Sequence, residues 1–386
     1  MDTRAWLQTL VGFDTTSRNA NMGLIETVRD ALSAQGVQSH LSYNVGGNKA
    51  NLFATLPAQD GQTQGGIILS GHTDVVPVDG QTWQSDPFTL TERDGKLYGR
   101  GAADMKGYLA VALAQVPAFL AMPRSKPLHL ALSYDEEVGC VGAPVMLADL
   151  KARGVRADGC VVGEPTGMRV VVAHKGINVF TCKVHGRATH SSLTPQGCNA
   201  IEYAARLICR IRDLADQYRD HGPYEALYDV PYTSVTTNLI QGGIAVNTIP
   251  QDCQFTYEFR NLPGMSPETI QAQVEAYVRD ELLPRMRREF EGAAVDIRCD
   301  ARAPALEASE QAAISQLVQA LAGARAGEAA KVAYATEAGL FHQAGIPTVV
   351  CGPGHIEQAH KADEYVAIEQ LQRCEAFLAK LGQSLI

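Results

Sequence analysis

The chain has 386 residues, of which 46% are hydrophobic, so it is long enough for a sizeable core and for two domains. Its formal net charge of -9 argues against nucleic acid as a partner, because proteins that bind a phosphate backbone usually carry a basic face. The sequence shows no uninterrupted apolar run of membrane-span length, and the stretch MDTRAWLQTL does not match a secretory signal. Nine scattered cysteines without a CxxC pair indicate buried thiols in a reducing compartment. We therefore expect a cytoplasmic protein without a membrane or nucleic-acid partner.

The first half of the chain alternates short apolar runs with segments of helical periodicity. Apolar residues recur at helical spacing over 24–32, and Gly36 is placed to end that helix. The further elements expected before residue 165 are strands over 51–56, 66–70, 128–134 and 159–163 and helices after Lys106 and over 142–153. This alternation predicts an α/β sheet with covered faces, in which ligand sites gather beyond the carboxyl ends of the strands.

The pattern changes near residue 178, where a run of alternating polar and apolar residues begins. The elements expected there are strands over 178–186, 233–240 and 252–260 and helices over 199–219 and 266–289. Their order fits a small α+β domain inserted into the first one. The larger fold resumes with helices over 309–323 and 367–382 and a strand over 347–352. We expect one domain from residues 1–177 and 298–386, and an inserted domain at 178–297.

Residues of the types that bind metals directly follow several of these apolar runs. They are His72 and Asp74 in SGHTDVVP, Asp104 in YGRGAADMKG, Glu136 and Glu137 in SYDEEVG, Glu164 in VVGEPT, and His360 in QAHKADEY. If the strands share one sheet, their ends converge, and this set suits two zinc ions, which take imidazole nitrogen and carboxylate oxygen. Two metals about 3.5–4 Å apart need a bridging carboxylate. An acid beside a ligand histidine, as Asp74 is beside His72, commonly orients the ring.

Each piece has an ordinary explanation when taken alone. A lone His-x-Asp is usually a surface or satisfied histidine, and an acid between glycines, such as Asp104, is usually a turn residue. The pair Glu136 and Glu137 fits a helix N-terminus, and His360 lies among charged residues that favour exposure. Their shared placement after apolar runs favours the metal site.

The motifs HTDVVPV, LYGRGAADMKG, SYDEEVGC, GEPT and QAHKADEY together resemble those of the dinuclear-zinc aminoacylase and carboxypeptidase family. The likeness runs through nearly the whole chain, inserted domain included. It implies a zinc-peptidase-like mixed sheet covered by helices, with an inserted ferredoxin-like domain for dimerisation and as a lid. It also implies two zinc ions per subunit, with cobalt or manganese as alternatives, and a homodimer.

The family pattern implies a role for each of the metal-site residues. His72 and His360 would each bind one zinc, Asp104 would bridge both, and Glu137 and Glu164 would each complete one set of ligands. Glu136 would bind no metal and would act as general base. The family also tends to have a cis peptide bond after the bridging acid, here between Asp104 and Met105.

Four further residues take roles from the same resemblance. His190 in the inserted domain would help to stabilise the oxyanion, from the partner subunit. Arg260, Asn247 and Thr336 would bind substrate, and a guanidinium suits an α-carboxylate because it offers two parallel hydrogen bonds. Without the resemblance, His190 is equally well a core or surface histidine and Arg260 an ordinary strand arginine.

The reaction implied is hydrolysis of an N-acyl amide of an amino acid. The segments GGNKANLFATLP, AHKGINVF and TEAGLF resemble most the family members that convert N2-acetyl-L-ornithine to L-ornithine and acetate in arginine biosynthesis. Alternatives within the same chemistry are desuccinylation of N-succinyl-diaminopimelate, hydrolysis of another N-acyl amino acid, and cleavage of a dipeptide. An alternative of a different class is a catalytically inactive binding protein of the same fold. A serine hydrolase is disfavoured because the sequence lacks a GxSxG elbow.

Overall fold

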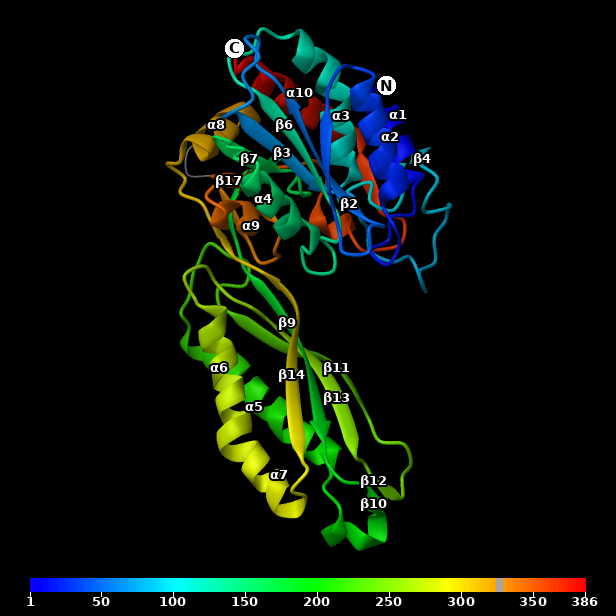
Figure 1. Ribbon diagram of the computed structural model, residues 1–386, viewed down its shortest axis with the longest axis vertical. Coiled ribbons are helices and arrows are strands. Elements are labelled where there is room, and N and C mark those ends of the chain that lie inside the picture. The colour runs from blue at the N-terminus through cyan, green and yellow to red at the C-terminus, as the bar shows by residue number, and fades with distance from the viewer. Residues whose placement is uncertain (324–328) are drawn as a thin grey trace. The chain divides into compact units, whose positions relative to one another are not determined.

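The computed structural model describes residues 1–323 and 329–386, which form two compact units (Figure 1). Unit 1 comprises Met1–Ala173, Leu306–Lys331 and Thr336–Ile386, and unit 2 comprises His174–Ala305 and Val332–Ala335. Unit 2 is wider at both ends than the insertion expected at 178–297. The reason is that its last strand continues to Ala303 and pairs there with Ile177 of its first strand.

Unit 1 is built on a mixed sheet with strand order β1-β2-β6-β3-β7-β17-β8-β15 and with β16 on β8. The strands are β1 (Ser39–Tyr43), β2 (Ala50–Leu56), β3 (Ile67–His72), β6 (Leu128–Ser133), β7 (Gly159–Val162), β8 (Val171–His174), β15 (Leu306–Glu307), β16 (Ala330–Val332) and β17 (Thr348–Val350). The central strands β6, β3, β7 and β17 run parallel, and all their residues are buried. Continuous apolar runs are typical of parallel strands covered on both faces, and the α/β prediction is confirmed.

Helices cover both faces of this sheet. They are α1 (Thr3–Val11), α2 (Met22–Ser33), α3 (Lys106–Ala121), α4 (Gly142–Ala152), α8 (Ala313–Ala322), α9 (Ala338–Gln343) and α10 (Ile368–Gln383). A Cβ atom on Gly71 would lie 2.6 Å from Met105 and 2.9 Å from Leu109, at the start of α3. The adjacent Ser70 instead donates to Glu337, at the start of α9. Because neighbouring strand residues point to opposite faces, α3 and α9 lie on opposite sides of the sheet.

The register of the parallel strands decides which residues leave the sheet side by side. His72, the last residue of β3, is level with Ser133, the last of β6. Ser70 is level with Val162, the last of β7, so Glu164 comes level with His72 two residues further on. The acids that follow β6 therefore leave the same edge as His72 and Glu164.

A second, three-stranded sheet of unit 1 has the order β18-β5-β4. Its strands are β4 (Thr91–Arg93), β5 (Lys96–Tyr98) and β18 (Tyr365–Ala367). Asp104 follows β5 in the chain and His360 precedes β18, and these two strands pair through Tyr98 and Tyr365. The pairing thus brings together two loops that carry predicted metal ligands.

Unit 2 has a four-stranded antiparallel sheet in the order β11-β13-β9-β14. Its main elements are β9 (Ile177–His185), α5 (Ala200–His221), β11 (Ser234–Gly242), β13 (Asp252–Arg260), α6 (Pro267–Tyr277), a π-helical turn (Val278–Leu282), α7 (Leu283–Glu289) and β14 (Ala294–Ala303). Apolar residues of the sheet and of these helices form one buried cluster. The ferredoxin-like order is confirmed, and the helix expected over 266–289 is interrupted by the π turn. A separate pair of short strands, β10 (Thr189–His190) and β12 (Thr248–Ile249), lies off the main sheet.

Two sequence-level expectations concern the surface and the thiols. Among the helices of the described residues, none combines the length and the apolar character that crossing a membrane requires. All nine cysteines are free thiols, and only Cys209 and Cys299 are exposed. The buried thiols agree with the expected packing role of cysteine.

Candidate metal centre

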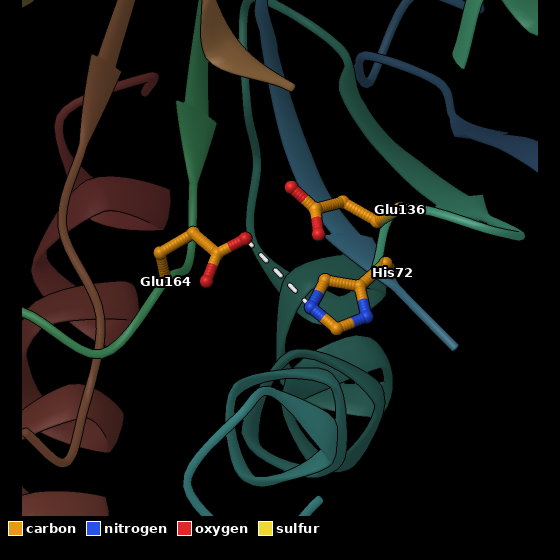
Figure 2. A group of neighbouring side chains, drawn as sticks. All are labelled: His72, Glu136 and Glu164. Carbon is orange, nitrogen blue, oxygen red and sulfur yellow. Dashed lines mark ion pairs between the residues drawn. The ribbon is translucent and has the colours of Figure 1, made fainter. Parts of the chain in front are cut away.

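His72, Glu136 and Glu164 come together beyond the carboxyl ends of β3, β6 and β7 (Figure 2). One ligand atom from each of the three lies within 4.8 Å of the others. The ring Nε2 of His72 is 3.7 Å from Glu164 Oε1 and 3.1 Å from Asp104 Oδ1. His72, Asp104 and Glu164 are at most 5% exposed, so these donors surround a sheltered first position for a cation.

A second position lies on the other side of Asp104. His360 Nε2 is 3.2 Å from Asp104 Oδ2 and 3.1 Å from Glu137 Oε2. The two oxygens of Asp104 therefore face one histidine each, which is the arrangement of a bridging carboxylate. The His360 side chain is 52% exposed, so this position is the more open one. The peptide bond between Asp104 and Met105 is cis, as the family resemblance implied.

The chemistry of this cluster fits divalent metal ions. Glu137 Oε1 is buried without a hydrogen-bond partner, and the other carboxylate oxygen, Oε2, faces His360. Burial raises the pKa of Glu137 to about 7, and the charge of Asp104 adds to the rise. The pKa of Glu164 is raised well above its usual range by burial and, to a smaller extent, by the charge of Asp104. Anionic oxygens and inward-facing imidazole nitrogens crowded into one site provide the ligands that zinc takes.

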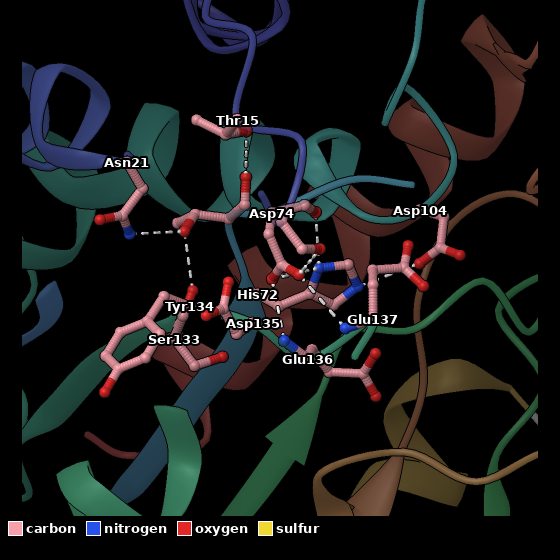
Figure 3. A network of polar contacts seen from close by, with 12 residues as sticks. Thr15, Asn21, His72, Asp74, Asp104, Ser133, Tyr134, Asp135, Glu136 and Glu137 are labelled. Carbon is pink, nitrogen blue, oxygen red and sulfur yellow. Dashed lines mark hydrogen bonds and ion pairs between the residues drawn. The ribbon is translucent and has the colours of Figure 1, made fainter. Parts of the chain in front are cut away.

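The carboxylate of Asp74 binds the backbone of Glu136 and Glu137, and its backbone oxygen contacts the ring of His72 (Figure 3). Its Oδ1 accepts from Glu136 N at 3.0 Å, and its Oδ2 accepts from Glu137 N at 3.2 Å and from Ser17 Oγ at 2.7 Å. The ring Nδ1 of His72 lies 2.9 Å from the backbone oxygen of Asp74 but 3.5 Å from Oδ1. The backbone carbonyl is thus the nearer partner of Nδ1, which leaves Nε2 to the cluster. The carboxylate holds the backbone of the loop after β6.

The three consecutive acids after β6 point to different partners. Asp135, with a left-handed backbone φ of +54°, binds Lys49 Nζ through both oxygens at 2.6 and 2.7 Å. Lys49 is 8% exposed and also donates to Ser17 O. Glu137 faces His360, and Glu136 lies beside His72 and Glu164. Lys49 had no predicted role, because lysine is usually exposed and only its pairing with Asp135, far away in the chain, buries it.

Thr336 and Glu337 directly precede α9 and are both buried. Thr336 is fully buried, and its Oγ1 accepts from Ala338 N at the start of α9. Glu337 is also fully buried and accepts from Ser70 Oγ at 2.7 Å and Ser133 Oγ at 2.6 Å. Glu337 therefore ties α9 to the ends of β3 and β6. Substrate binding by Thr336 stays a prediction.

The predicted residues of unit 2 fall into two groups. His190 on β10 is level with Thr248 of β12, and the next residue, Ser191, donates to Asn247 O at 3.0 Å. His190 and Asn247 are exposed. Arg260 lies at the far end of β13, eight residues beyond Asp252, or roughly 26 Å at about 3.3 Å per residue. Within unit 2, His190 and Asn247 lie close together, and Arg260 lies far from both.

Residues 68–384 match the model of the peptidase family M20/M25/M40. The chain belongs to this family. It is 37% identical over 98% of its length to an acetylornithine deacetylase from Myxococcus xanthus, covering 96% of that protein. It is 33% identical over 97% of its length to an acetylornithine deacetylase from Pasteurella multocida, covering 94% of it. An M20 family metallo-carboxypeptidase from Sulfolobus solfataricus has the same fold, with a TM-score of 0.77, 18% identity and coverage of 100% of this chain and 99% of that one.

The resemblance noted from the motifs is thereby confirmed. Membership of the M20/M25/M40 family, together with the clustered histidines and carboxylates, identifies a metal-dependent amidohydrolase.

We predict that metal stabilises the protein through Asp104. Metal ions should raise the free energy of unfolding because they offset the repulsion among buried carboxylates, by about 2.7 kcal/mol at a free metal concentration 100 times Kd. Asp104→Ala should lose most of this increase. The exposed Asp213→Ala on α5 is the control and should keep it. Thermal unfolding with zinc and after chelation checks the prediction, and an undiminished rise in Asp104→Ala would contradict it.

Proposed function

We propose that the protein is a di-zinc enzyme that converts N2-acetyl-L-ornithine to L-ornithine and acetate. The observation that carries the proposal is the pair of histidine–carboxylate positions joined by Asp104, with Glu136 next to one of them. The choice of substrate is supported by the two relatives named acetylornithine deacetylase, which match over nearly the whole chain. Zinc is favoured by the nitrogen and oxygen ligands, and cobalt or manganese suits the same donors.

Glu136 is the proposed proton carrier. When bound, zinc ions supply the positive charge that polarises an acyl carbonyl and lowers the pKa of water towards neutrality. Glu136 takes a proton from the attacking water and delivers it to the nitrogen of the leaving amine as the C–N bond breaks. Burial raises the pKa of Glu136 to about 8, and the charge of Glu137 adds to the rise. Metal cations beside Glu136 would lower this pKa and keep the carboxylate ionised, so that it can accept the proton from water.

We predict that Glu136→Gln keeps two metal ions per chain but loses about 10²–10⁴-fold in kcat, because proton transfer by a positioned side chain contributes that much. The adjacent Glu137→Gln is the matched control and should lose metal, because it replaces a charged ligand of one position. Metal analysis and kcat on the same preparations check both. Turnover of Glu136→Gln close to that of the wild type would show that another group moves the proton.

The two groups of residues in unit 2 support a site completed across a dimer. His190 and Asn247 lie far from Arg260, so one copy of unit 2 does not place all three around one small substrate. We therefore assign Arg260 to the substrate carboxylate in one subunit and His190 and Asn247 to the site of the partner. Arg260 Nε lies 3.2 Å from Glu258 Oε1, and the Arg260 side chain is 30% exposed.

The edge strand β11 supports the same dimer. It lies at one end of the four-stranded sheet, and an edge strand presents unpaired backbone groups to another chain. Leu239 and Ile240 on this strand are 68% and 58% exposed, and Ile244 and Val246 just beyond it are almost fully exposed. Such a row of apolar side chains beside an open edge fits pairing with a second copy.

We predict that Ile240→Lys converts a dimer to a monomer and lowers turnover, because a charge at the pairing edge is costly and His190 is then lost from the partner's site. Metal content should not change. The fully exposed Val45→Lys, in unit 1, is the control and should stay dimeric and active. Light scattering and kcat measure the two effects. A fully active monomer would contradict both the dimer and the role of His190 in the partner's site.

The substrate assignment predicts an order of reactivity. The value of kcat/KM should be higher for N2-acetylornithine than for N-acetylcitrulline, N-acetylmethionine, N-succinyl-diaminopimelate or a dipeptide. Chelation should abolish turnover of every substrate.

Arg260→Met should raise KM because the α-carboxylate of the substrate loses its paired donors. The control Arg298→Met, whose arginine is 72% exposed on β14, should leave KM unchanged. Preference for the succinyl substrate would identify a desuccinylase. No turnover by metal-loaded protein would favour a binding protein.

A further inference from the structure

The loop that carries Asp104 is held by one buried carboxylate. Glu364 Oε1 accepts from Ala103 N and Asp104 N, each at 3.0 Å, and Oε2 accepts from Gly101 N at 3.1 Å. Glu364 is 1% exposed. Three backbone donors on one carboxylate fix the position of the Asp104 backbone.

Arg100, on the same loop as Asp104, binds this carboxylate and the backbone of the loop that carries His360. Its Nη1 donates to Glu364 Oε2 at 2.7 Å and to Lys361 O at 3.3 Å. Its Nη2 donates to Gln81 Oε1 at 2.5 Å, and the guanidinium lies 5.0 Å from the centre of the Trp83 ring. Arg100 is 1% exposed, so its planar group is fixed on all sides by protein.

Gln81 completes the connection to His360. Its Nε2 donates to His360 O at 3.0 Å, while its Oε1 accepts from Arg100. The backbone of His360 has a φ of +62°, a left-handed conformation that a residue with a Cβ adopts only when its surroundings hold it. Glu364, Arg100 and Gln81 thus form a brace between Asp104 and His360.

The brace acts unequally on the two metal positions. His72 ends a strand that is paired on both sides, and its ring is held by Asp74. His360 lies on a loop and is half exposed, and Gln81 and Arg100 hold the backbone at His360 and Lys361. A buried ion pair contributes little net stability, so its advantage here is the geometry that it fixes.

We propose that Arg100, Glu364 and Gln81 are positioning residues that set the affinity of the metal position between His360 and Glu137. The inference rests on the proposed two-metal centre. Residues that orient ligands from behind typically change metal affinity by about 10–100-fold when they are replaced. When only the contact of Gln81 with His360 is removed, the loss should fall on the second metal ion and leave the first, at His72 and Glu164, within about twofold.

The test is a stepwise zinc titration of metal-free protein against a competing chromophoric chelator. Gln81→Met removes the bond to His360 and the bond from Arg100 but leaves the Arg100–Glu364 pair in place, so the variant should fold. Its second zinc should bind at least about tenfold more weakly than in the wild type. Gln84→Met, on the same loop and exposed, is the matched control and should titrate like the wild type.

A second variant tests the buried pair itself. Arg100→Lys keeps the positive charge but loses the fork that binds Glu364, Lys361 and Gln81, so the second zinc should bind more weakly still. The unfolding midpoint of the metal-free variant shows whether it has folded, and Gln81→Met carries the test if it has not. Equal weakening of both zinc ions in Gln81→Met, or no weakening there, would overturn the brace. A wild type that binds only one zinc would instead overturn the two-metal proposal itself.

Discussion

Electrostatic repulsion among buried carboxylates is the constraint on which the rest of this site depends. Asp74, Glu136, Glu137 and Glu164 follow three parallel strands, and Asp104, from the loop after β5, joins them; Asp74 and Asp104 are at most 5% exposed. Negative charges gathered in a medium of low dielectric repel strongly. Such a group persists in a folded protein when cations balance it, and the inward-facing nitrogens of His72 and His360 show where two metal ions would do so.

The surroundings of the cluster sort these acids into different tasks. Lys49 binds Asp135 and removes that charge from the site, while Asp74 binds the backbone of the next two residues. Glu137 is thereby directed to one metal position, and Glu136 is left beside the other. The roles proposed for them, a ligand and a proton carrier on adjacent residues, are compatible because a third carboxylate, the buried Asp74, fixes the loop between them.

The sequence predicts which histidines and carboxylates cluster, because these candidate ligands follow apolar strands in a regular way. Parallel strands end at a common edge, so His72, the acids after residue 134 and Glu164 could be placed together without a structure. The helix over 3–11 was not expected, although Trp6, Leu7 and Leu10 have helical spacing and are all buried.

The supporting contacts could not be predicted in the same way. Lys49 and Asp135 are 86 residues apart, and Arg100 and Glu364 are 264 apart. No local periodicity specifies such pairs, because only the packing of whole elements brings them together. The same holds for unit 2, where the antiparallel register of β13 separates Arg260 from His190 by most of a strand.

The most direct test of this account is a crystal structure of the zinc-loaded protein, with the metals located by anomalous scattering. The account predicts two ions about 3.5–4 Å apart with Asp104 between them. One ion should be bound by His72 and Glu164 and the other by His360 and Glu137, with Glu136 coordinating neither. A single ion, or Glu136 in the coordination sphere in place of Glu137 or Glu164, would contradict it.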